Sequence, residues 1–83
     1  MGRRETIRGF ILENFLPGSG AEAFSDGDSF MEQGIIDSTG FLELVAFLEK
    51  TYGFKIADEE LIPDNLDSID RILAFLAAKV PEP

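Results

Sequence analysis

The chain has 83 residues, enough for one small domain, and a domain of this size buries only about 60% of the surface that its unfolded form exposes. Its 16 acidic and 7 basic residues give a net charge of −9, which argues against nucleic acid as a partner, because phosphate neutralisation needs clustered Lys and Arg. The chain contains no Cys and no His, which excludes disulfides, thiolate metal sites, cysteine nucleophiles and Ser-His relays.

The first predicted element is a helix over residues 3–16. Pro17 and Gly18 end it, and the stretch 17–28, rich in Gly, Ser and Asp, is expected to form a loop. Apolar side chains at helical spacing mark the face of this helix that we expect to be buried: Ile7, Phe10, Ile11 and Phe15.

A capped turn is predicted inside the long connection that follows. Ser29 and Glu32 have the spacing of a capping box, and Gly34 suits a left-handed exit. A connection this long is unusual in a small domain, so it requires apolar anchors to the core. The expected anchors are Phe30, Ile35 and Ile36.

The second helix is predicted over residues 38–52 and ends at Gly53. Asp37 or Ser38 is its natural N-cap. A wide apolar arc is expected to face the core: Phe41, Leu42, Leu44, Val45, Leu48 and Tyr52. The outward face is expected to carry Thr39, Gly40, Glu43, Ala46, Glu49 and Lys50.

Two further helices complete the predicted fold. A short helix over 58–62, capped by Asp58 and closed by Pro63, follows an extended stretch at 54–56, and a last helix covers 68–79. The apolar stripe of that last helix is Ile69, Ile72, Leu73, Phe75 and Leu76. The sum is one all-α domain over 1–83, a four-helix bundle of three longer helices and one short one.

Ser38 carries the functional interpretation. It lies where an apolar loop end enters the second helix, and unpaired backbone N–H groups at a helix start favour negative charge. Such a position suits a serine that carries a phosphate ester. Taken alone, however, an Asp-Ser pair at a helix start is most often a plain N-cap.

The motifs around Ser38 extend far along the chain. They are Asp-Ser at 37–38, Glu-Leu at 43–44, Tyr-Gly-Phe at 52–54, the stretch 56–66, and Leu-Asp-Ser-Ile at 66–69 before a Leu/Ala/Phe-rich helix. Together they resemble the acyl carrier and peptidyl carrier proteins over roughly residues 30–79. A match of this breadth is far more specific than an Asp-Ser pair.

The resemblance implies a non-catalytic carrier. A phosphopantetheinyl transferase would move 4′-phosphopantetheine from coenzyme A onto Ser38, and Asp37 would orient the site during that step. The arm would hold an acyl or aminoacyl group as a thioester and deliver it to successive enzymes.

The chain departs from the pattern of fatty-acid carriers, which have Leu and then an acidic residue after the serine. Here Thr39 and Gly40 stand at those positions. The resemblance then favours a freestanding carrier of a specialised lipid, polyketide or peptide pathway over one of fatty acid biosynthesis, served by its own acid-activating ligase. Cargo and pathway stay open.

The predicted partner-binding face is drawn from the second helix and from the stretch 58–62. For its acidic residues, a solvated helix surface or a favourable charge at a helix start is an equally good interpretation. The face comprises Thr39, Glu43, Ala46, Glu49, Asp58, Glu59, Glu60 and Ile62. Ile62 is equally compatible with the core.

Two other function classes compete with the carrier. One is an unmodified helical adaptor that binds proteins through its acidic face. The other is a calcium module built from Asp26, Asp28 and Asp37, although their spacing does not follow the EF-hand pattern. We expect no metal site and no membrane span, since no apolar run is long enough to cross a bilayer. The start Met1–Glu5 lacks the apolar stretch of a signal peptide, and a cytoplasmic monomer is expected.

Overall fold

The computed structural model describes residues 2–20 and 22–81, so Ala21 of the predicted loop lies outside the described residues. The helices are α1 (Arg3–Phe15), α2 (Ser38–Tyr52), α3 (Pro63–Leu66) and α4 (Ile69–Lys79), with a 3₁₀ turn, η1, at Asp58–Glu60. The prediction of an all-α bundle with three longer helices is confirmed. The predicted bounds of α2 agree with those of the structure, and Gly53 ends this helix in the left-handed region, at φ 68°.

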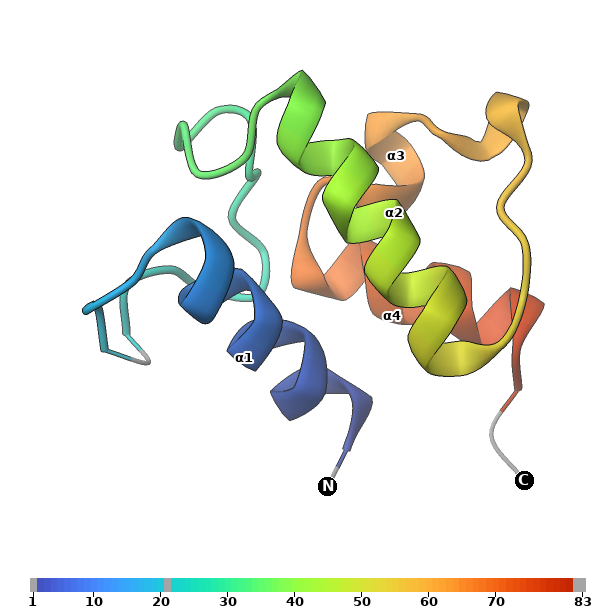
Figure 1. Cartoon of the computed structure of the whole chain (residues 1–83), viewed down its shortest axis with the longest axis horizontal. Helices are drawn as coiled ribbons and strands as arrows, with labels where there is room; N and C mark the ends of the chain where they lie inside the picture. The colour runs from blue at the N-terminus through green and yellow to red at the C-terminus, as the bar shows by residue number, and fades with distance from the viewer. Residues whose placement is uncertain (1, 21, 82–83) are drawn as a thin grey trace.

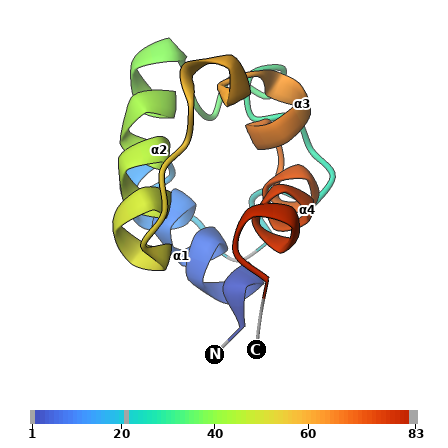
Figure 2. The ribbon, with the colours of Figure 1, turned by 90° about the vertical axis from the view of Figure 1, so that its right-hand side faces the viewer.

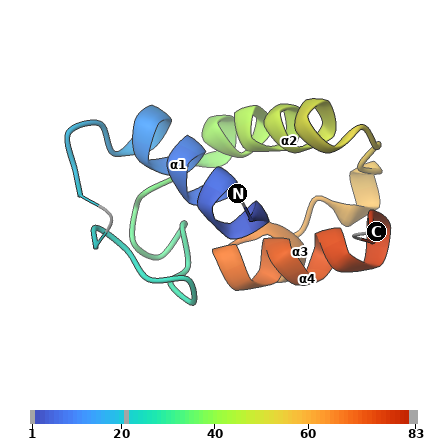
Figure 3. The ribbon, with the colours of Figure 1, turned by 90° about the horizontal axis from the view of Figure 1, so that it is seen from below.

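The helices enclose one core. Helix α2 lies on one side of the molecule and α3 with α4 on the other, and α1 runs along one edge (Figures 1, 2 and 3). The long connection between α1 and α2 loops outward past the end of α1 and returns to the start of α2 (Figure 1). At the start of α1, the Arg3 guanidinium donates to the carbonyl of Val80, the residue that follows α4.

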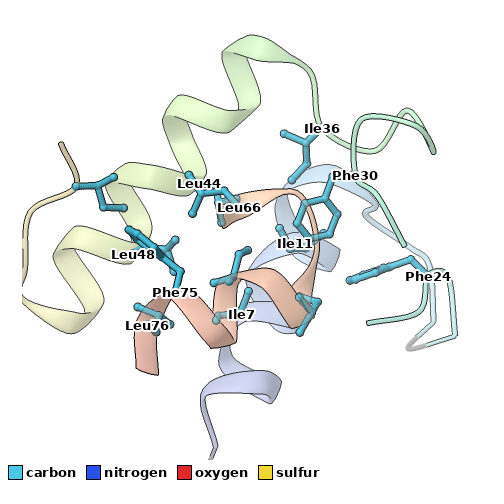
Figure 4. Packing of buried hydrophobic residues seen from close by; sticks show 13 residues of the cluster. Ile7, Ile11, Phe24, Phe30, Ile36, Leu44, Leu48, Leu66, Phe75 and Leu76 are labelled. Carbon is cyan, nitrogen blue, oxygen red and sulfur yellow. The ribbon is translucent and has the colours of Figure 1, made fainter. Parts of the chain in front are cut away.

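All four helices and the connection contribute to the core (Figure 4). Phe30 and Ile36 are buried and Ile35 is half-buried, which confirms that these residues tie the connection down. The buried hydrophobic residues are Ile7, Ile11, Phe24, Phe30, Ile36, Leu44, Leu48, Ile56, Leu66, Ile69, Ile72, Phe75 and Leu76.

A buried arginine also fixes the connection. Arg8 is only 8% exposed; its guanidinium stacks 4.2 Å from the centre of the Phe24 ring and donates to the Phe24 carbonyl at 2.8 Å. It also donates to the Asp26 carboxylate at 2.8 Å, and Arg4 binds the other Asp26 oxygen. The hydrogen bond from Arg4, with a further one from Arg8, holds the pKa of Asp26 below its ordinary value.

The region around Pro63 differs from the prediction. The turn η1 ends at Glu60, and Pro63 does not close a helix but is the first residue of α3. Proline fits that position because the N–H that it lacks would have no partner inside the helix. Ala57, not Asp58, occupies the N-cap position of η1, where its N–H donates to the Glu60 carboxylate at 2.9 Å.

Candidate functional site

The start of α2 separates the cap from the exposed serine. Asp37 is the N-cap, and its carboxylate accepts the Gly40 N–H at 2.8 Å. Ser38 is therefore the first helical residue, exposed to solvent, and its hydroxyl is not the cap. This geometry rules out the interpretation of Ser38 as a plain N-cap.

The surroundings of Ser38 favour an anion. Helix α2 has 15 residues and no acidic side chain in its first turn, so the Asp37 cap is the carboxylate nearest to its positive end. Of the first four N–H groups, the side chain of Asp37 takes one, that of Gly40. A phosphate ester on the adjacent hydroxyl would lie against the remaining donors of this helix end.

Gly40 lies in the core behind Ser38, so its predicted place on the outward face is wrong. A Cβ atom there would lie 2.8 Å from Cγ2 of Ile36 and 2.8 Å from Cε1 of Phe15. The end of α1 therefore packs directly against the backbone of α2 at its first turn.

An apolar pocket of about 270 Å³ opens beside Ser38. Helix α2, the connection before it, and the segment from Leu61 through α3 form its walls. Apart from Ser38, all of its lining side chains are apolar: Met31, Phe41, Leu42, Val45, Leu61, Ile62, Pro63 and Leu66.

The rim of this pocket gathers the exposed apolar surface. Four large hydrophobic residues are exposed among those described, namely Met31, Leu42, Leu61 and Ile62, and all four line the pocket. Leu42 is 64% exposed, which corrects its predicted place in the buried arc of α2, and Ile62 is 44% exposed and is not a core residue. Exposed apolar side chains gathered in this way are typical of a binding site.

The predicted partner-binding residues fall into two groups. Six are exposed, on α2, in η1 or on the pocket rim: Thr39, Glu43, Ala46, Asp58, Glu59 and Ile62. The other two have partners within the chain. Glu49 accepts the Ile56 N–H at 2.7 Å, and Glu60 binds Lys79 at 2.8 Å, a contact that lowers the pKa of Glu60.

The three aspartates of the alternative calcium site already have protein partners. Asp26 binds two arginines, Asp28 accepts the Ser25 N–H at 2.8 Å, and Asp37 caps α2. Over residues 2–20 and 22–81, no group of three or more acidic side chains is arranged to hold a metal ion. None of the described helices has the length and apolar character needed to cross a membrane.

Sequence comparisons show which known proteins this chain is similar to. Residues 18–76 match the family described as "Phosphopantetheine attachment site". A D-alanyl carrier protein from Abiotrophia defectiva is 31% identical over 49 residues, which are 59% of this chain and 62% of that protein. The aligned region therefore spans less than two thirds of the relative's length.

Proposed function

Because the chain belongs to the phosphopantetheine attachment-site family of carrier proteins, we propose that Ser38 is its attachment residue and that it carries acyl or aminoacyl groups as thioesters. Carrier proteins of this family hold a covalently attached 4′-phosphopantetheine. The group supplies a flexible arm whose terminal thiol binds the cargo.

The observation that carries the proposal is the division of roles between Asp37 and Ser38. The carboxylate of Asp37 caps α2 by accepting the Gly40 N–H. Ser38 is exposed, and its hydroxyl does not serve as the helix cap. The residues fit the group on both sides of this hydroxyl. The helix end favours the charge of the phosphodiester, and the apolar pocket offers a surface to the arm.

The chain's own part in the loading step is small. Asp37 holds the first turn of α2 in place. The Ser38 oxygen would attack the phosphorus of coenzyme A that bears the pantetheine arm, forming the serine phosphodiester and breaking the pyrophosphate bond, so that adenosine 3′,5′-bisphosphate leaves. The phosphopantetheinyl transferase would supply the magnesium ion and the base that accepts the hydroxyl proton. We assign no catalytic residue to the carrier itself.

The partners follow from the surface around Ser38. The exposed apolar rim and the exposed carboxylates of Glu43, Asp58 and Glu59 suit enzymes with a basic rim around an apolar contact. The relative's name favours D-alanine or another amino acid among the possible cargoes. We propose that an acid-activating ligase loads the arm, that downstream enzymes unload it, and that these steps take place in the cytoplasm.

Intact mass spectrometry tests the proposal directly. The protein would be incubated with coenzyme A, magnesium and a broad-specificity phosphopantetheinyl transferase, beside Ser38→Ala and the neighbouring control Thr39→Ala. We expect the mass of one phosphopantetheine on the wild type and on Thr39→Ala, and none on Ser38→Ala. Modification of a folded Ser38→Ala, or its absence from the wild type, would contradict the assignment.

The fold of the variants is checked by circular dichroism. Since Ser38 is exposed and does not cap α2, its replacement should change the free energy of unfolding by no more than about 0.5 kcal/mol. A lack of modification in Ser38→Ala then reports on the hydroxyl and not on unfolding.

A further inference from the structure

One carboxylate outside the site binds the connection that leads into it. Asp67 lies between α3 and α4 and is not among the residues that line the pocket. One of its carboxylate oxygens accepts the Ser29 hydroxyl, the other accepts the Met31 N–H at 3.1 Å, and its backbone carbonyl accepts the Phe30 N–H at 2.9 Å. Three consecutive residues of the connection are thus bound to one residue.

The turn that Asp67 holds is closed by its own hydrogen bonds. The Ser29 hydroxyl accepts the Glu32 N–H at 3.1 Å, as expected from the capping-box spacing, and Gly34 leaves the turn at φ 70°. The Phe30 carbonyl then accepts the Ile35 N–H at 2.9 Å. A compact, hydrogen-bonded turn therefore links the residues bound by Asp67 to Ile35, which lies three residues before Ser38.

Asp67 also connects opposite walls of the pocket. On one side it holds Met31, which is 48% exposed and lines the pocket from the connection. On the other side it follows Leu66, a pocket residue, and its N–H donates to the Pro63 carbonyl at 3.0 Å. Asp67 thus joins the wall from the connection to the wall from α3, through its side chain at Ser29 and Met31 and through its backbone carbonyl at Phe30.

We infer that Asp67 is a positioning residue for the Ser38 site. It sets the place of Met31 and of the chain entering α2 without contacting the serine. A carboxylate suits this task because its two oxygens accept a hydroxyl and an N–H at once. An asparagine could keep one of these bonds with its carbonyl, and an alanine could keep neither, although both retain the bond to the backbone carbonyl.

The first test uses protein without the phosphopantetheine group, so its result does not depend on the proposed function. Two-dimensional ¹H–¹⁵N spectra for the amides and ¹H–¹³C spectra for the methyl groups would compare Asp67→Ala, Asp67→Asn and the adjacent control Ser68→Ala. Ser68 is buried and caps α4 by accepting the Arg71 N–H, and among the described residues it makes no hydrogen bond to the turn at 29–34. We expect Asp67→Ala to shift the Ser38 and Leu42 amide signals and the Met31 methyl signal, Asp67→Asn to shift them less, and Ser68→Ala to leave them in place.

The second test rests on the proposed function and uses the rate of loading. At a temperature where all variants are folded, we expect Asp67→Ala to lower kcat/KM of the transferase at least about fivefold and Ser68→Ala less than about twofold, with Asp67→Asn between them. Equal loading of Asp67→Ala and Ser68→Ala, or signal changes confined to residues adjacent to position 67, would overturn the inference. A wild type that is not loaded would contradict the proposed function, while the spectral comparison would still decide the role of Asp67.

Discussion

Gly40→Ala is expected to destabilise the protein although alanine is the better helix former. In a helix interior the exchange normally gains about 1 kcal/mol. At position 40 the added methyl group would lie 2.8 Å from both Ile36 and Phe15, and overpacking of this kind costs about 1–3 kcal/mol. Phe15 cannot move away easily because its ring packs edge-on against Phe10, with centroids 5.9 Å apart. The net expectation is a loss of about 1 kcal/mol, or about 4–8 °C in Tm.

Gly9→Ala provides the matched control for this prediction. Gly9 lies inside α1, and a Cβ atom there would meet nothing within 4 Å. The same substitution should therefore stabilise the protein by about 0.5–1 kcal/mol. Urea unfolding followed by circular dichroism would show midpoints that move in opposite directions at a constant m-value. A midpoint raised by both variants alike would refute the claim that α1 packs against the backbone of α2 at Gly40.

Three further predictions concern the ion pair of the connection, the cap and the pocket. The hydrogen bonds from Arg4 and Arg8 lower the pKa of Asp26, so the stability that this carboxylate contributes is full above its unfolded pKa of 3.8 and is lost as the pH falls through its lower folded pKa. Asp26→Asn should therefore lower Tm at pH 6, and in a series of thermal melts the Tm of this variant should decrease less steeply below pH 4 than that of the wild type. Asp37→Ala removes the cap of α2 and should cost about 1 kcal/mol in urea unfolding, and an unchanged midpoint would show that the bond to the Gly40 N–H contributes nothing. Leu42→Ala should change the free energy of unfolding by no more than about 0.5 kcal/mol but raise the transferase's KM for the carrier. Leu44 is fully buried, so Leu44→Ala should cost about 2–5 kcal/mol of stability. A comparable loss of stability in both variants would contradict the exposed position of Leu42.

The parts of the fold that local signals determine could be predicted from the sequence. Helix α2 begins and ends where its cap and Gly53 place it, because both act through hydrogen bonds within a few residues. The prediction that Pro63 closes a helix is wrong, because a local signal of this kind is ambiguous. A proline is compatible with the first turn of a helix as well as with the region after one, and its sequence position alone does not separate the two.

The burial of Gly40 and Arg8 could not be found by periodicity, because their partners come from other parts of the chain. Gly40 meets Phe15 of α1, and Arg8 binds Asp26, eighteen residues away. A weak signal existed for the first, since a glycine inside a predicted helix is unfavourable unless a close approach requires it. The arginine gave no comparable signal, because a long side chain at the edge of an apolar stripe usually reaches solvent.

The pocket beside Ser38 illustrates where apolar periodicity reaches its limit. Spacing assigns Leu42 to the buried arc of α2, yet a side chain can belong to an apolar arc and still face an opening where the opposite element stands away. In this chain the opposite wall includes Leu61, Ile62 and Pro63, which follow η1, whereas the sequence predicts one helix over 58–62 closed by Pro63. A domain of 83 residues has little stability to spare, and exposed leucine and isoleucine side chains add almost nothing to it. Their position around a serine that does not serve as the helix cap is explained if these side chains contact the arm, the cargo or a partner enzyme. Comparing Leu42→Ala with Leu44→Ala tests this, because it separates a contribution to enzyme binding from a contribution to stability.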